Sequence, residues 1–122
     1  MIKEDYVSFE TAKLLKEKGF DEPCLSYFWS EGIDTSYTET PFTQNNMYEG
    51  QILRPTLQMA MKWLREKHKI DIAIYPYGEY TCDNYQFDVY KDTRLKISKD
   101  NGFMQYEQAL EAAINYCLEN LI

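Results

Sequence analysis

The order of hydrophobic periodicities constrains the fold of this chain more than any other feature. Apolar residues recur at intervals of three and four, as on one face of a helix, near the start, middle and end of the chain. Two stretches between them alternate with a period of two, which strands require. We therefore expect an α+β protein in the order helix, hairpin, helix, hairpin, helix, with the helices packed on one face of an antiparallel sheet. The length of 122 residues predicts a single globular domain over 1–122.

End signals delimit the three predicted helices. Ser8 is a suitable N-cap for the first helix, and Gly19 follows where a left-handed C-terminal glycine is common, with Phe20 as its hydrophobic contact. Pro55 opens the second helix, since proline is favoured in a first turn. The third helix begins at Tyr106, after which apolar residues recur at helical spacing to the end of the chain.

The first predicted hairpin pairs residues 24–30 with residues 36–40. Leu25, Tyr27 and Trp29 fall on one side of its first strand, and Pro41 is expected to stop the second strand. Residues 42–51 follow as an irregular loop.

The second predicted hairpin begins with a strand at 70–74 that Pro76 ends. A turn at 82–84 leads to a partner strand at 85–90. A short strand is expected at 95–97, and loop is expected at 100–102.

Charge is concentrated in one part of the chain. The chain has a formal charge of −7, and no Lys or Arg occurs between Lys18 and Arg54. Six acids lie in this segment: Asp21, Glu22, Glu31, Asp34, Glu39 and Glu49. An acidic surface with aromatic anchors suits a protein partner better than a phosphate backbone, so we expect a protein partner and disfavour nucleic acid.

Aromatic residues make up 16% of the chain, and 11 of them are tyrosines. Tyrosine can cover a sheet with its ring while its hydroxyl faces water, so we expect a Tyr-rich sheet face that is partly exposed. The predicted binding residues combine this face with the acidic segment: Tyr27, Trp29, Glu31, Asp34, Glu39, Tyr75 and Tyr77.

A basic stripe on the second helix offers an alternative site. Arg54, Lys62, Arg65 and Lys69 would lie together there, opposite an apolar face. Such a stripe is most often a solvated helix face, but it would also suit nucleic acid, as would mimicry of DNA by the acidic segment.

Catalytic and metal signatures are missing from the sequence. His68 is the single histidine, and Cys24, Cys82 and Cys117 are too far apart for a zinc or redox motif. We expect no catalytic residue, no metal and no cofactor, although a small enzyme with an aromatic pocket stays open as a third class of function. Cys117 has core spacing on the last helix and is expected to be a buried thiol.

A resemblance points to an origin. The segment from Asp5 to Phe20, the run Lys62-Trp63-Leu64-Arg65-Glu66 and the closing run from Tyr106 to Ala112 resemble small proteins of prophages and mobile elements of gut anaerobic bacteria. The resemblance implies a bacterial or phage cytoplasmic protein and brings no known activity. With no signal peptide and no apolar run long enough for a bilayer, we expect a cytoplasmic interaction protein without a membrane association, acting as a monomer or a homodimer.

Overall fold

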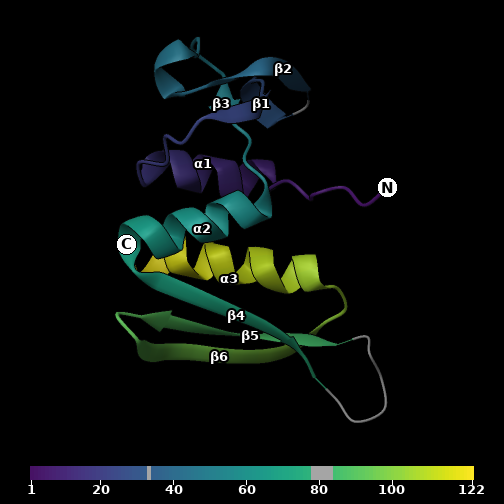
Figure 1. The fold of residues 1–122 in the computed structure, drawn as a ribbon, viewed down its shortest axis with the longest axis vertical. Helices are drawn as coiled ribbons and strands as arrows, with labels where there is room; N and C mark the ends of the chain where they lie inside the picture. The colour runs from purple at the N-terminus through teal and green to yellow at the C-terminus, as the bar shows by residue number, and fades with distance from the viewer. Residues whose placement is uncertain (33, 78–83) are drawn as a thin grey trace. The chain divides into compact units, whose positions relative to one another are not determined.

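The computed structural model describes residues 1–32, 34–77 and 84–122, apart from the side chains of residues 30, 100 and 101. Figure 1 shows helices interleaved with strands, and the α+β class is confirmed. Contacts divide the chain into two compact units, Met1–Ala60 and Met61–Ile122. Each unit contains a three-stranded antiparallel sheet, so the expectation of one sheet and of a simple helix-hairpin alternation is wrong. The single domain over residues 1–122 stays a prediction.

The first unit begins with helix α1 (Phe9–Glu17), whose two ends match the sequence signals. The Ser8 hydroxyl accepts a hydrogen bond from the Thr11 amide over 3.3 Å. At the other end Gly19 has a φ of +90°, and its N–H donates to the Lys16 carbonyl over 3.1 Å. The Phe20 N–H donates to the Leu15 carbonyl over 2.9 Å, which completes a Schellman cap.

The sheet of the first unit has the order β2-β1-β3. Strand β1 (Cys24–Phe28) lies in the centre, and strands β2 (Thr35–Phe42) and β3 (Ile52–Leu53) pair with it antiparallel. Two 3-10 turns, η1 (Ser30–Gly32) and η2 (Gln44–Asn46), complete the connections of this unit. Helix α2 (Leu57–His68) follows and crosses the boundary between the units.

Two predictions about this sheet need correction. Strand β3 was missed because two residues are too few to show a period. Pro41 does not stop β2, which runs on to Phe42. Proline is tolerated there because β2 is an edge strand, and Pro41 falls in a bulge where no ladder hydrogen bond needs its missing N–H.

The second unit contains the rest of α2 and strands β4 (Ile70–Pro76), β5 (Tyr85–Lys91) and β6 (Arg94–Phe103), followed by helix α3 (Tyr106–Asn120). The strands pair antiparallel in the order β4-β5-β6. The prediction for β6 was too short, because the strand continues through the expected loop at 100–102 with a bulge. The turn predicted at 82–84 falls mainly outside the described residues.

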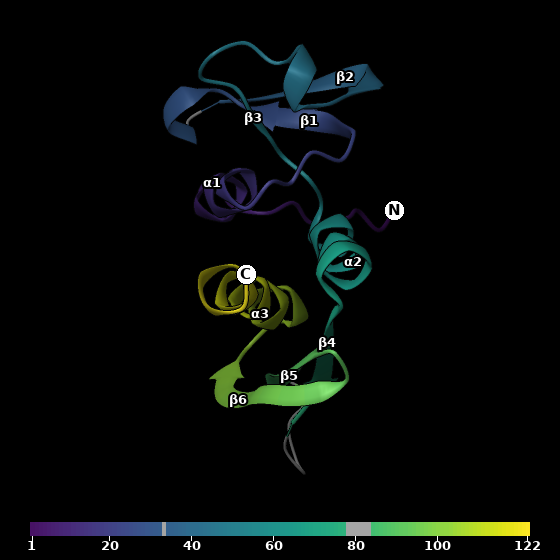
Figure 2. The same ribbon diagram turned by 90° about the vertical axis from the view of Figure 1, so that its left-hand side faces the viewer.

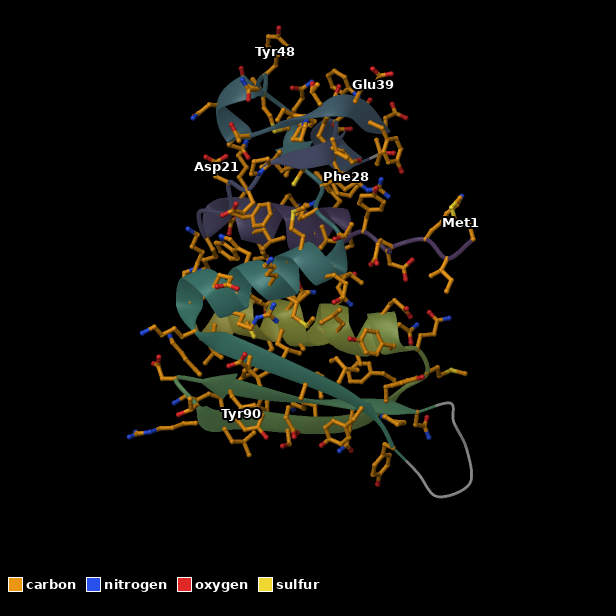
Figure 3. All side chains as sticks on the ribbon, in the orientation of Figure 1. Met1, Asp21, Phe28, Glu39, Tyr48 and Tyr90 are labelled. Atoms are coloured by element: carbon orange, nitrogen blue, oxygen red, sulfur yellow. The ribbon has the colours of Figure 1, made fainter. Side chains whose placement is uncertain are left out.

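The two faces of this second sheet differ. Phe87 and Val89 are buried on the face that α3 covers, and Leu110 and Ile114 of α3 have no exposed surface. In Figure 2 α3 is seen nearly end-on above β5 and β6. Figure 3 shows Tyr90 on the opposite face of the sheet. The second sheet therefore has one covered face and one half-exposed face.

Candidate interaction surface

Strand β1 separates a buried face from an exposed one. Cys24, Ser26 and Phe28 are buried, and the Phe28 ring meets Phe9 of α1 edge to face at a centroid distance of 5.4 Å. Figure 3 shows Phe28 on the side of β1 that faces α1. The alternate residues point to the other side, where Leu25 is 49% exposed. The period of two seen in the sequence is confirmed in this strand.

Three rings form a continuous row beside Leu25, which we call the aromatic row. Tyr27 lies between Trp29, at 5.4 Å, and Phe42, at 5.0 Å, and both ring pairs are edge to face. Trp29 is 41% exposed, while Tyr27 and Phe42 are half-buried. Edge-to-face ring pairs stabilise a protein by more than the apolar area that they bury. The three rings therefore hold one another in a fixed orientation and form a rigid, mainly apolar surface.

A hydrogen bond fixes the orientation of Trp29. Its indole N–H donates to the Ser36 hydroxyl on β2 over 2.9 Å. Ser36 is the cross-strand partner of Tyr27, so strand register sets this contact. An aromatic ring that is already fixed in the free protein loses little conformational entropy when a partner binds. Trp29 is therefore suited to anchor an interface.

Three exposed acidic side chains belong to the same unit as the aromatic row. Glu31 and Asp34 are exposed in the tight turn between β1 and β2. The Trp29 amide donates to the Asp34 carbonyl over 2.9 Å, which holds the turn against the end of β1. Glu39 is exposed on β2 and is labelled in Figure 3. Asp21 has a structural role instead, since its carboxylate accepts a hydrogen bond from the Gln44 amide over 2.6 Å.

The predicted binding residues thus fall into two groups. Tyr27 and Trp29 touch, Glu31 and Asp34 lie in the adjoining turn and Glu39 lies on β2 of the same unit. Tyr75 and Tyr77 belong to the second unit. Sequence reasoning missed Phe42 and Ser36. Phe42 follows a proline in a segment expected to be loop, and the role of Ser36 depends on a register that no local pattern reveals.

Tyr75 lies on the exposed face of the second sheet. Its hydroxyl donates to the Asp88 carboxylate over 3.1 Å. Partial burial and the nearby Asp88 raise the pKa of Tyr75. Tyr77 follows β4 and is 47% exposed.

The sequence assigned Arg54 to the alternative basic stripe, but its side chain stacks on and hydrogen-bonds to residues of the first unit. Its guanidinium lies 4.0 Å from the centroid of the Tyr6 ring, and Nη1 donates to the Tyr37 hydroxyl over 2.8 Å and to Ser26 Oγ over 3.3 Å. Phe28 and Tyr37 rings also lie within cation–π range. Of the remaining stripe residues, Lys62 and Arg65 are exposed on α2 and Lys69 is exposed after its end.

Two cysteines and the single histidine are the thiol and imidazole groups in the described part of the chain. Burial raises the pKa of Cys24 to about 12, and burial does the same for Cys117. Cys82 lies outside the described residues. His68 packs edge to face on Trp63 at 4.8 Å, and burial followed by the Lys91 charge lowers its pKa. Within residues 1–32, 34–77 and 84–122 no three His, Cys, Asp or Glu residues are grouped as metal ligands.

None of the described helices has the length and apolar composition that crossing a membrane requires. In comparisons with known proteins, no family model matches this chain, and neither does any curated protein or solved structure.

Proposed function

We propose that this protein is a non-enzymatic interaction protein that binds a basic segment of another protein through the aromatic row of its first unit. The observation that carries the proposal is the Tyr27 ring held between Trp29 and Phe42, with the Trp29 indole fixed by Ser36. Protein interfaces are commonly anchored by aromatic residues of this kind, surrounded by a polar rim.

The negative charge of the first unit indicates that its partner is basic. The segment between Lys18 and Arg54 has six acids and no base, and Arg54 itself is engaged inside the first unit. A partner surface rich in Lys and Arg, with apolar side chains between them, complements an aromatic row with acids in the same unit. An acidic partner or a nucleic acid would be repelled by the same surface.

A cytoplasmic location and an origin in a phage or mobile element form part of this proposal. They rest on the resemblance of three segments of the sequence. The free thiols Cys24 and Cys117 are compatible with a reducing compartment.

Selection from a random peptide library tests the proposed function directly, because the library supplies candidate partner segments of every charge. We expect the wild-type protein to enrich peptides that carry Lys and Arg among aliphatic or aromatic residues. A variant with Leu25→Ser and Trp29→Ser should lose most of this enrichment, because it lacks two exposed apolar contacts but keeps every acid.

A control variant with the same number of exposed apolar changes in the second unit, Leu95→Ser and Tyr77→Ser, should keep the enrichment. Enrichment of acidic or uncharged peptides by the wild-type protein would refute the proposal. Equal enrichment by the Leu25/Trp29 variant would also refute it. Binding of a labelled DNA or RNA duplex that depends on Lys62, Arg65 and Lys69 would favour the nucleic-acid alternative instead.

A further inference from the structure

A pocket of about 250 Å³ opens between helix α3 and strands β5 and β6 of the second unit. Its walls are mainly apolar and come from Phe87, Phe103, Ala112 and Tyr116. The Phe87 and Phe103 rings lie 5.9 Å apart with a tilt of 37°, and only 3% of Phe87 is exposed. Phe103 and Tyr116 are half-buried, so these two rings, rather than Phe87, present surface to whatever enters the pocket.

A bulge in the sheet and a small residue on the helix lie at this pocket. The register of β5 and β6 shifts between Phe87, which pairs with Lys99, and Tyr85, which pairs with Phe103. The resulting bulge passes through Gly102, whose φ of +69° suits a residue without a side chain. On the helix side, Ala112 offers only a methyl group. Bulges often re-aim side chains beside binding sites.

The mouth of the pocket carries two opposite charges. Lys99 of β6 and Glu119 of α3 both line it, and both are exposed. Neither side chain has an ion pair or hydrogen bond with the part of the chain that the structure describes. The two charges are therefore available to a ligand, one from the sheet and one from the helix.

We propose that this pocket binds a free α-amino acid with an aromatic or large aliphatic side chain. The ligand carboxylate would pair with Lys99 and its ammonium with Glu119, while its side chain would lie against Phe103, Ala112 and Tyr116. The volume lies just below the range of about 300–1,000 Å³ typical of sites for drug-sized ligands, which suits a molecule of amino-acid size.

This site is independent of the proposed interaction surface, because all its residues belong to the second unit. Failure of either proposal leaves the other intact. The main competing occupant is an apolar side chain of a peptide, which would need the rings of the pocket but neither of the charges at its mouth.

Calorimetric titration with five defined probes separates these occupants. L-phenylalanine and L-leucine should bind with saturation. Phenethylamine lacks the carboxylate and 3-phenylpropionate lacks the ammonium, so each should bind at least tenfold more weakly than L-phenylalanine. N-acetyl-L-phenylalanine amide lacks both charges and should be the weakest. Equal binding of this neutral amide would overturn the proposal in favour of a peptide side chain.

Variants locate the binding in the pocket. Lys99→Gln should weaken L-phenylalanine binding at least tenfold, whereas Lys96→Gln, on the same strand but outside the pocket, should leave it unchanged. Ala112→Leu should fill the pocket and abolish binding, and circular dichroism should show that this variant keeps its fold. If the Ala112→Leu variant does not fold, the Lys99→Gln variant alone tests the site. Absence of saturable binding by the wild-type protein, or binding indifferent to Lys99→Gln, would overturn the assignment.

Discussion

The indole N–H of Trp29 donates a hydrogen bond to the hydroxyl of Ser36 across the β1–β2 pair, over 2.9 Å. This contact connects strand register to the exposed surface, because Ser36 stands opposite Tyr27, the central ring of the aromatic row. A polar residue in an edge strand thus fixes the exposed aromatic residue that the proposed function depends on most.

Removal of this hydroxyl should affect binding more than stability. Ser36→Ala removes one exposed hydrogen bond, so the free energy of unfolding should fall by no more than about 1 kcal/mol. The Trp29 ring would gain rotamer freedom, and selected peptides should dissociate faster. Fluorine NMR of 5-fluorotryptophan should show a shifted Trp29 signal and an unchanged Trp63 signal. A Trp29 signal that does not respond would show that the hydrogen bond does not hold the ring.

Two glycines with similar backbone angles should differ in their tolerance of a methyl group. Gly19 and Gly32 have φ values of +90° and +72°. Nothing lies within 4 Å of a Cβ built at Gly19, whereas one built at Gly32 would come within 2.8 Å of Phe9 Cβ and closer still to the Phe9 ring. Gly19→Ala should cost about 1–2 kcal/mol from backbone strain alone.

Gly32→Ala should cost more than Gly19→Ala, because Phe9 must move away from its contact with Phe28. Urea denaturation of both variants measures the difference. Equal losses would contradict the close packing of the β1–β2 turn against α1.

Arg54 should stabilise the first unit rather than act as part of a surface stripe. Arg54→Met removes the stacking on Tyr6 and the hydrogen bonds to Tyr37 and Ser26, so we expect a loss of about 1–3 kcal/mol in the free energy of unfolding. Arg65→Met, at an exposed position on α2, should change it by less than about 0.5 kcal/mol. Similar effects of the two substitutions in urea denaturation would contradict this role.

The buried thiols should make the protein less stable in alkali. The pKa of Cys24 and of Cys117 is raised to about 12 in the folded state, above the usual value of 9.0. Between pH 9 and pH 12 the unfolded thiols lose their protons while the folded ones keep them, so the equilibrium shifts toward unfolding. Each thiol should contribute a loss of about 1.4 kcal/mol per pH unit in that range and none below it.

Comparison with Cys117→Ala isolates this effect from the titration of lysines and tyrosines. Any stability advantage of the wild-type protein over the variant should be constant from pH 6 to pH 8 and should shrink above pH 9. A constant difference up to pH 11 would show that the thiol is not buried as a neutral group.

The sequence predicted correctly those features that depend only on residues close together in the chain. Ser8 and Gly19 fixed the ends of α1 because caps are local hydrogen-bond patterns. The alternation in β1 predicted which side chains are exposed, and Cys117 is buried at its helical spacing as expected.

The features that the sequence did not predict depend on pairing between strands. β3 has two residues and exists only because β1 offers a free edge. The contact of Phe42 with Tyr27 requires the bulge in β2, and the engagement of Arg54 requires β3 to bring it beside Ser26. Such contacts join residues 15 or more positions apart, which no periodicity encodes.

The proposed function requires the exposed acids Glu31, Asp34 and Glu39 of the first unit to recruit a basic partner. The most direct measurement is the association rate of a selected basic peptide with a variant carrying Glu31→Gln, Asp34→Asn and Glu39→Gln, against a control of equal charge carrying Glu66→Gln, Asp71→Asn and Asp92→Asn. We predict at least tenfold slower association for the first variant, a smaller effect for the control, and weaker salt dependence once these acids are neutral. Equal association rates for both variants would contradict the account.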